Sequence, residues 1–554
     1  MRTRLKVAVF FLLCVASGCQ TGGRTTAPAG ARVPLFAGLG RHHRAVTTSS
    51  SLAQQYFAQG LVWAYAFTHD EAIRSFEEAT RQDPNCAMAY WGIALCNGPH
   101  INNPKMTPER SKAAWAALQK AVSLKDRGEP AERAMISALE KRYADPAPED
   151  RKALDEAYAA AMRDAWNAQR DDPDIGSLFA EAMMDLRPWD LWTHDRKPQP
   201  GTEEIVAVLE QVLRVDPMHP GANHLNIHAL EASAHPERAI PAADRIRQSV
   251  PGAGHLVHMP SHIDVLTGQW AKASRQNELA IHADATYRKI SPKQDFYRVY
   301  MTHNQHMLAF AAMMEGRSET ALRAARDIVA GVPREYGEKQ AALVDPSMAI
   351  PYEVLTRFGR WDEVLKEPAP PSYWPITNAL WRFTRGVAFA AKGKVAEADA
   401  ERVKFRSAAA QVSADAMMAI NPAQRVFGIA EHMLNGEIAY RRGNLDEAVK
   451  ELQEAIRFED SLQYMEPPEW IQPVRHALGA MLVSGKRYEE AEKVYRDDLR
   501  KWPENGWSLL GLSKCLRARG AHAEAEDVEK RFRAVWSRSD VQIGSSCLCV
   551  PGGV

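Results

Sequence analysis

A unit of about 34 residues recurs along this sequence and constrains its fold more than any other feature. In residues 53–86, small side chains stand at positions 8 and 20 of the unit (Gly60 and Ala72), an aromatic ring at position 24 (Phe76) and a proline at position 32 (Pro84). The small residues let two helices approach closely, the aromatic fills the gap to the next unit, and the proline ends the second helix. Strand signals are almost absent. The sequence therefore predicts a chain of helical hairpins.

The same spacing returns later in the chain. The unit that begins at residue 472 has Gly479, Ala491, Tyr495 and Pro503 at the equivalent positions, and further units begin at residues 220, 254, 302, 379 and 429. This pattern resembles the tetratricopeptide repeat (TPR). The resemblance implies an all-α, right-handed superhelical solenoid of about 10 to 12 hairpins. In such arrays the first helices line a concave face, and each unit buries its apolar side against its neighbours.

The N-terminal residues have the pattern of an export signal. Basic residues precede an apolar stretch at 7–15 that is too short to span a bilayer, and small residues then lead to Cys19. The Gly18–Cys19 junction resembles the lipobox of bacterial lipoproteins. This resemblance implies that a lipidated Cys19 anchors an exported protein in the lipid bilayer, with Gln20 favouring the periplasmic face of the outer membrane. An ordinary secretion signal is the alternative.

These features divide the chain into segments. We expect a lipoprotein signal peptide (1–18), a flexible tether and N-terminal extension (19–50), N-terminal hairpins (51–174), central His-rich units (175–333), degenerate hairpins (334–428), C-terminal hairpins (429–538) and a Cys-containing tail (539–554). The tether is predicted because residues 20–34 are mainly Gly, Thr, Ala and Pro and offer little to bury.

Histidines are concentrated in the central units. The chain has 18 His, of which ten lie between residues 219 and 306. Seven of them fall in the first helices of three units with spacings of three or four residues, which place them on one helical face. These seven are His224, His228, His255, His258, His262, His303 and His306. Their positions in the repeat predict that all seven side chains point into the concave groove.

A patch of imidazoles is typical of a transition-metal site. Neutral His is the commonest ligand of Zn, Cu and Fe, and the pattern does not distinguish between these metals. Seven rings exceed the needs of one tetrahedral ion, so we expect two ions, or one ion and proton-transfer groups. Glu231 is a candidate general base, and Pro260 is expected to kink the helix that carries His258 and His262. A groove for an anionic or peptide ligand and a structural polar network are the alternatives.

Polar residues before the His-rich units suggest a substrate site. Asp185 and Arg187 are predicted to end the preceding first helix, and Trp189 and Asp190 open an insertion that can form a wall or lid. This combination is suited to a planar or sugar-like ligand. The alternative is that the tryptophan packs the loop and that Arg187 pairs with Asp185.

Other histidines and the cysteines have simpler predicted roles. Asn223 and Asn304 stand beside cluster histidines and are candidate partners for the rings. His42, His69 and His100 are expected to be structural. Cys547 and Cys549 are possible extra metal ligands if the tail reaches the groove, or part of an incidental mobile tail.

The composition excludes several classes of protein. The 69 basic and 69 acidic side chains argue against a nucleic-acid-binding protein held by bulk electrostatics. Seven cysteines in 554 residues are too few for a disulfide scaffold. Apart from the N-terminus, no apolar run is long enough to span a bilayer.

Longer phrases add a second resemblance. The sequence contains LRPWDLWT, HPGANHLNIHALEAS, GAGHLVHMPSHI and THNQHMLAFAAMMEGR, which resemble a widespread group of exported bacterial TPR proteins. The resemblance implies a fold and an exported location but no activity. The leading hypothesis is a membrane-anchored, periplasm-facing TPR protein whose concave face binds one or two transition-metal ions. Hydrolytic and oxidative metalloenzyme chemistry are both open under this hypothesis. The alternatives are a non-catalytic scaffold for a peptide or envelope protein in the groove, and a metal carrier or sensor.

Overall fold

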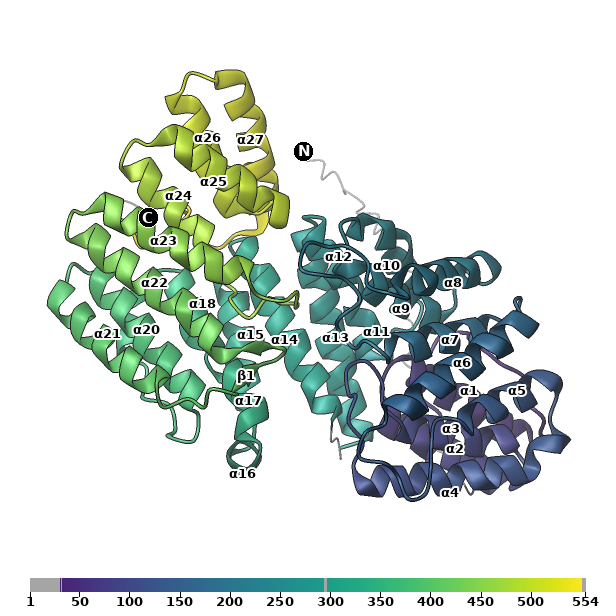
Figure 1. The fold of residues 1–554 in the computed structure, drawn as a ribbon. Coiled ribbons are helices and arrows are strands. Elements are labelled where there is room, and N and C mark those ends of the chain that lie inside the picture. The colour runs from purple at the N-terminus through teal and green to yellow at the C-terminus, as the bar shows by residue number, and fades with distance from the viewer. Residues whose placement is uncertain (1–29, 31, 293–295, 551–554) are drawn as a thin grey trace, which may run out of the picture.

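The computed structural model describes residues 30, 32–292 and 296–550, and helices dominate this part of the chain (Figure 1). The strands β1 (Met417–Met418) and β2 (Asn421–Pro422) form a short antiparallel hairpin in which Met417 is opposite Pro422. Successive helices pack on one another throughout. The predicted solenoid of helical hairpins is confirmed.

The N-terminal hairpins are pairs of packed helices, as the repeat pattern predicts. Their bounds are α1 (Ser51–Tyr65), α2 (His69–Gln82), α3 (Ala87–Asn97), α4 (Pro108–Leu124), α5 (Pro130–Leu139), α6 (Lys152–Ala168), α7 (Pro173–Met184) and α8 (Thr202–Val215), with the 3-10 helix η1 (Lys125–Arg127).

The central units are less regular. They contain α9 (Pro220–Glu231), η2 (Pro236–Ala239), α10 (Ile240–Ile246), α11 (Gly254–His258), α12 (Pro260–Leu266), α13 (Trp270–Ile290), α14 (Tyr297–Met314) and α15 (Ser318–Ala330). The helix is interrupted before Pro260, as the missing N–H of proline predicts.

The C-terminal half begins with short helices and continues with regular hairpins. Its elements are α16 (Arg334–Lys339), α17 (Ala341–Met348), α18 (Ile350–Arg357), α19 (Trp361–Lys366), α20 (Pro375–Ala391), α21 (Val395–Ala409), α22 (Ala423–Arg441), α23 (Leu445–Asp460), α24 (Val474–Ser484), α25 (Tyr488–Lys501), α26 (Gly506–Ala518), α27 (His522–Val535) and η3 (Trp536–Arg538).

The small and aromatic positions of the repeat pack as predicted. A Cβ atom added to Gly60 or Gly92 would lie 2.6 Å from the ring of Phe76, which therefore fills the space between two consecutive first helices. Tyr495 has the same place between Gly479 and Gly511 near the other end of the chain. First helices of neighbouring units also contact each other, as α1 with α3 and α24 with α26.

This packing predicts the effect of a small substitution. Gly→Ala inside an exposed helix stabilises it by about 0.5–1 kcal/mol. We expect Gly92→Ala to do the opposite and lower the free energy of unfolding by about 1–3 kcal/mol, because the new methyl group overlaps the buried Phe76 ring. Urea unfolding followed by circular dichroism measures this change. A more stable variant would contradict the packing.

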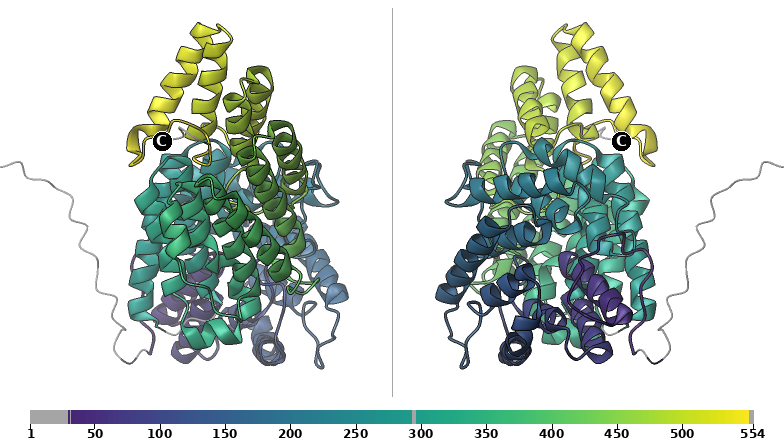
Figure 2. Two further views of the ribbon diagram at one scale, coloured as in Figure 1. Left: turned by 90° about the vertical axis from the view of Figure 1, so that its left-hand side faces the viewer. Right: turned by 90° about the vertical axis from the view of Figure 1, so that its right-hand side faces the viewer.

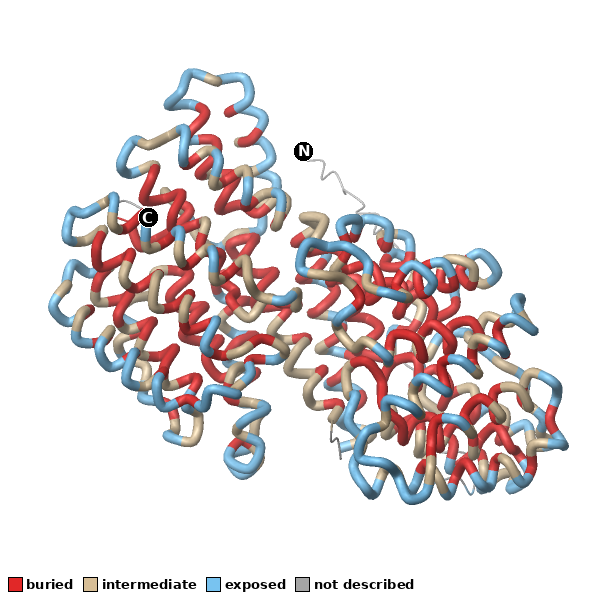
Figure 3. Tube along the Cα trace, viewed as in Figure 1, coloured by how far each residue is buried: buried red, intermediate tan, exposed pale blue. Residues whose placement is uncertain are grey.

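The array forms two lobes that meet at its centre. In Figure 1, α1–α13 make one lobe and α14–α27 the other, and Figure 2 places the α26–α27 hairpin at the opposite end of the molecule from α1–α5. Buried residues run through the interior of both lobes, while the turns are exposed (Figure 3). The first lobe curves so tightly that α1 contacts α9, which is far along the chain. This curvature brings N-terminal residues to the central histidines.

The N-terminal extension is fixed to the first lobe from residue 32 onward. Arg44 forms ion pairs with Asp172 and Asp174, and the Gly252 N–H donates to the Gly38 carbonyl. The Arg32 N–H donates to Glu78, and the Val33 and Pro34 carbonyls accept from Tyr56 and Gln59. The prediction of a tether therefore does not hold for residues 32–34. The signal peptide and Cys19 lie outside the described residues. Within the described ranges, the helices lack the combined length and apolar character that crossing a bilayer requires.

Candidate metal centre

Four helices of the central units bring the predicted histidines together. His224 and His228 lie on α9, His255 and His258 on α11, His262 on α12, and His303 and His306 on α14. These rings were predicted to point into the concave groove, but the first five are at most 6% exposed and are therefore buried. They are enclosed between the N-terminal helices and a segment of the C-terminal half. His303 and His306 are half-buried.

The first group, here called triad A, consists of His224, His228 and His255. Their ring nitrogens include one set of ligand atoms that lie within 4.8 Å of one another. His224 Nδ1–H donates to the Tyr65 carbonyl at 2.7 Å, and His228 Nδ1–H donates to Glu231 Oε1 at 2.9 Å. Both Nε2 atoms are buried without a hydrogen-bond partner, as are both ring nitrogens of His255.

Triad A has the features of a metal-binding set. Ligand imidazoles commonly donate one N–H to a carbonyl or carboxylate, which fixes the ring and leaves the other nitrogen for the metal. Buried polar atoms are otherwise almost always hydrogen-bonded, so several unpaired imidazole nitrogens facing one region call for a ligand. The three nitrogens would have to move closer together to form the roughly 2 Å bonds of a Zn or Cu ion, starting from spacings within 4.8 Å. Three His ligands leave a further position open.

Burial keeps these rings in the form that binds metals. Desolvation, assisted by the nearby His262, lowers the pKa of His228 to about 3. Burial also holds the pKa of His224 and of His255 well below the ordinary value. All three imidazoles are therefore neutral near pH 7, and a metal ion has no proton to displace from them.

The second group, triad B, consists of His258, His262 and His303. His258 Nδ1–H donates to the Asn277 side-chain oxygen at 2.7 Å, and the amide is oriented by its own bond to the Ala273 carbonyl. The Nε2 atoms of His258 and His262 lie 2.6 Å apart, closer than two ligands of one ion, so they share a proton in this structure.

Two carboxylates on the other side of the ring stabilise a positive charge on His262. His262 Nδ1 lies 2.6 Å from Glu231 Oε2 and 3.0 Å from Glu466 Oε1. Burial alone would lower the pKa of His262, but the carboxylates of Glu466 and Glu231 raise it to about 10. Triad B thus holds a proton that a second metal ion would have to replace.

Glu231 connects the two triads. Its Oε1 accepts from His228 and its Oε2 from His262. Because both oxygens are occupied by imidazole N–H groups, the geometry does not support the predicted role of general base. Glu231 is a positioning residue that sets the orientation of a ring in each triad.

Several residues of the site were not predicted from the sequence. Glu466 and Tyr464 come from the connection between α23 and α24, and the Tyr464 hydroxyl donates to Glu466 at 2.7 Å. The available signal was an acidic residue between an aromatic and two prolines in 464–468. Asn277 also supports a ring, whereas Asn223 and Asn304 bond to other groups, the former to the Pro217 carbonyl and the latter to Asp284.

The predicted substrate residues separate into two sets. Helix α7 ends at Met184, and Asp185 is buried in an ion pair with Arg142, not with Arg187. Asp185 does not line the cavity next to the histidines, so the structure separates it from the other predicted substrate residues. Arg187 instead pairs with Asp190 at 3.2 Å.

A polar cavity of about 770 Å³ adjoins triad A. Arg187, Trp189 and Asp190 line it together with His228 and Glu231. The Trp189 ring meets that of His228 edge-to-face, with centroids 5.6 Å apart. The insertion that Trp189 and Asp190 open forms one wall of this cavity. It reaches the second lobe, where the His194 ring bonds to the Asp460 carbonyl.

His306 lies outside both triads. Its ring lines a different cavity, described below, and its Nε2 atom is buried without a partner.

The N-terminal histidines were expected to be structural. In the structure His42 and His100 lie in different surroundings. His42 and His219 both bond to Asp174 Oδ1, which also accepts from Tyr65. Three side chains therefore share one carboxylate oxygen, and these contacts fix the N-terminal extension and α9 to α7. His100 instead stacks near Phe67, whose ring centroid lies 4.5 Å from those of both His100 and His224.

The C-terminal cysteines do not reach the histidines. Cys547 and Cys549 form a disulfide with each other and are buried in the core of the second lobe. Neither thiolate is available as a ligand in this structure, and the mobile tail considered above is ordered through residue 550.

A known repeat family matches two parts of the chain. The family model described as Tetratricopeptide repeat matches residues 69–97 and 479–538. The chain contains tetratricopeptide repeats. The matched residues cover α2 with α3 and α25 with α26 and α27, in which the Phe76 and Tyr495 packing described above is found. None of the curated proteins matches the sequence.

Solved structures of helical arrays are similar over most of the chain at low identity. The human IFIT1 dimer with m7Gppp-AAAA is 15% identical over 88% of this chain and 91% of that chain, with a TM-score of 0.32. Cut9–Hcn1, an APC/C hetero-tetramer, is 12% identical over 89% and 76%, with a TM-score of 0.29. The P58(IPK) TPR domain is 13% identical over 85% and 98%, with a TM-score of 0.21. At these identities none of them indicates a function for this chain.

Proposed function

We propose that this protein binds a transition-metal ion, Cu, Zn or Fe, through His224, His228 and His255, and that it is a metalloenzyme. The observation that carries the proposal is the set of buried, unpaired imidazole nitrogens in triad A, two of whose rings are fixed through Nδ1 by Tyr65 and Glu231. A structural core rarely leaves so many polar atoms without a partner in one place.

The surroundings favour catalysis over storage. Structural metal sites are closed by protein ligands, whereas catalytic sites keep a position for water or substrate. Triad A offers three rings, and the polar cavity adjoins His228. A bound ion would supply Lewis-acid or redox chemistry at that position. The chain itself contributes the orientation of the rings through Glu231, a proton shared by His258 and His262, and Trp189 as a wall.

A second ion in triad B belongs to the same proposal. It would take the place of the proton between His258 and His262, with His303 as the third ligand. The three rings are next to triad A, since the centroids of His228 and His262 are 5.5 Å apart. Elemental analysis separates the two cases, because a full second site doubles the metal content.

The location is proposed from the sequence alone. A lipidated Cys19 would anchor the protein to a bacterial membrane, and the described residues begin shortly after it. The repeat fold also suits a protein or peptide partner, since TPR arrays present extended binding surfaces. A peptide in a groove over the histidines is disfavoured, because the segment with Glu466 covers them.

Elemental analysis of untagged protein tests the metal site. We expect near-stoichiometric transition metal in the wild type and its loss in His255→Ala, because this ring has no hydrogen bond to the protein whose loss would disturb the fold. Inductively coupled plasma mass spectrometry gives the metal content, and circular dichroism checks folding.

The matched control is His235→Ala. His235 is on the same lobe but exposed, and its ring bonds to Glu237, away from the cluster. It should keep the wild-type metal content. Equal metal in His255→Ala and the wild type, or none in the wild type after growth with each metal in turn, would refute the site.

A further inference from the structure

The last described residues of the chain, 544–550, are bound by helices of several different hairpins. This stretch, here called the tail segment, contains neither helix nor strand. Its main-chain carbonyls accept hydrogen bonds from basic side chains of α18, α22 and α26, namely Arg357 to Ser546, Arg441 to Cys549 and Lys514 to Gly544. From Ser546 to Val550 its residues are at most 9% exposed. Side-chain contacts therefore hold the tail segment in the core of the second lobe.

Ser546 joins the tail segment to α24. Its hydroxyl donates to the His476 carbonyl at 2.8 Å and lies 2.7 Å from the Tyr495 hydroxyl. The His476 ring accepts from Arg357 through Nδ1 and donates to Asp498 through Nε2, each at 2.8 Å. His476 belongs to the first turn of α24, so the position of the tail segment and the start of this helix depend on each other.

The residues just before α24 pack with the tail segment. They form the connection from α23, residues 461–473, here called the cover segment. Trp470 of the cover segment shares a hydrophobic cluster with Cys547 and Cys549, and Ile471 shares the neighbouring cluster with Leu548. Release of the tail segment would therefore loosen both clusters in which the cover segment is anchored.

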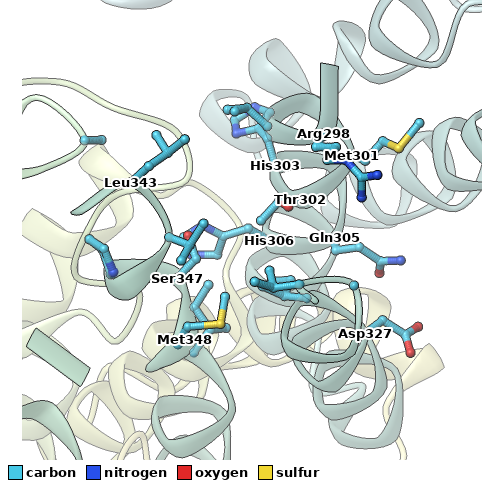
Figure 4. Close-up of a pocket in the computed structure, with 18 of the residues that line it drawn as sticks. Arg298, Met301, Thr302, His303, Gln305, His306, Asp327, Leu343, Ser347 and Met348 are labelled. Atoms are coloured by element: carbon cyan, nitrogen blue, oxygen red, sulfur yellow. The ribbon is translucent and has the colours of Figure 1, made fainter. Parts of the chain in front are cut away.

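The cover segment lies over the histidines. Its Glu466 carboxylate is 3.0 Å from His262 Nδ1, and the Tyr464 hydroxyl donates to that carboxylate. The same segment lines a cavity of about 670 Å³, which His303 and His306 of α14 also line (Figure 4). An outward movement of the cover segment would take Glu466 away from His262 and open this cavity toward triad B.

We propose that the tail segment is a redox-controlled clasp that holds the cover segment over the histidines. Cys547 and Cys549 form a disulfide, which closes a ring around Leu548. This ring limits the conformations of the undocked tail segment, so docking loses less conformational entropy than it would without the cross-link. For a loop this short, the difference corresponds to about tenfold tighter docking. The disulfide therefore favours the covered state of the histidine cluster.

Reduction reverses this preference. A dithiol reductant attacks one sulfur, forms a mixed disulfide and then closes its own disulfide, so two electrons and two protons pass to Cys547 and Cys549. Both cysteines are at most 4% exposed when docked, so the attack requires an undocked tail segment. The two thiols then restore conformational freedom to the tail segment, and the cover segment opens more often. The clasp itself needs no metal, whereas its effect on metal exchange rests on the proposed function.

Hydrogen exchange followed by mass spectrometry tests the clasp on the full chain. We expect dithiothreitol to raise the amide exchange rate of residues 461–484 about tenfold and to leave that of α1–α5 unchanged. Cys86, Cys96 and Cys515 are free, so within the described residues the reductant acts on this disulfide alone. Alkylation with iodoacetamide counts the new thiols. Unchanged exchange in the fully reduced chain, or a disulfide that is reduced only after unfolding, would overturn the proposal.

The variant Cys547→Ala/Cys549→Ala removes the cross-link without a reductant. Its exchange in residues 461–484 should be about tenfold faster than in the oxidised wild type and should not respond to dithiothreitol. Cys515→Ala is the control, because Cys515 is a buried free cysteine of the same hydrophobic cluster, and it should respond as the wild type does. A response of the double variant to the reductant, or exchange as slow as in the oxidised wild type, would overturn the clasp. If a variant does not fold, the comparison of oxidised and reduced wild type decides.

Metal release separates this proposal from the metal centre. A chelator should remove metal from Cys547→Ala/Cys549→Ala about tenfold faster than from the wild type, because the cover segment opens more often. Equal release rates would refute control of the metal site by the clasp. Redox-dependent exchange in a protein that never takes up metal would refute the metal centre and leave the clasp. Stoichiometric metal in a protein whose exchange is independent of the redox state would do the reverse.

Discussion

Replacing Glu231 by Ala is expected to weaken metal binding by about 10- to 100-fold, the usual effect of removing a group that orients a ligand histidine. The reason is that Glu231 accepts from His228 in triad A and from His262 in triad B. Without the carboxylate both rings are free to turn. Competition titration against a chromophoric chelator measures the affinity.

Glu231→Gln sharpens this test. The amide oxygen can still accept from one imidazole, but its NH₂ group faces the N–H of the other, so affinity should fall to an intermediate value. A general base predicts the opposite pattern, with metal retained and turnover lost. Glu237→Ala is the control, because this exposed carboxylate bonds to His235 in the same way but away from the cluster. Unchanged affinity in Glu231→Ala would refute the positioning role.

Breaking the buried Arg142–Asp185 pair is expected to cost about 3–5 kcal/mol of stability. The two side chains are 3% and 5% exposed, and Arg142 also donates to the Pro99 carbonyl. In Arg142→Met the Asp185 carboxylate is left buried without its cation. Urea unfolding followed by circular dichroism gives the free-energy change.

The double variant Arg142→Met/Asp185→Leu provides the comparison. Replacing both members of a buried ion pair by apolar residues is often nearly neutral, so most of the lost stability should return. This result would establish that Asp185 supports the fold. If Asp185 served a ligand instead, Asp185→Leu alone would leave stability unchanged and the double variant would be no more stable than Arg142→Met.

The repeat pattern predicted the helices well because its signals are local. Phe76 needs small neighbours at fixed spacings, and Gly60 and Gly92 provide them wherever the chain is a stack of hairpins. The histidine registers followed for the same reason, since positions 224 and 228, or 258 and 262, share a helical face in any helix. The sequence could therefore indicate six rings that come together in two groups, although the prediction also included His306, which lies outside both.

The sequence could not indicate what surrounds those rings. Tyr65 reaches His224 because the first lobe curves until α1 contacts α9, and Glu466 reaches His262 because the second lobe folds back over the centre. Small angles between successive hairpins accumulate into this curvature, and no local pattern encodes their sum. Asp185 likewise pairs with Arg142, which is distant in the sequence, and does not line the cavity.

By itself, the sequence determined the helical array, the position of each histidine on its helix, and the neutral charge balance. Only the tertiary structure decided that five of the seven rings are buried, that Glu231 contacts two of them, and that a cavity adjoins His228. The physical reason is that helix formation depends on contacts between residues three or four apart, whereas burial and pairing at this site depend on residues separated by more than a hundred positions.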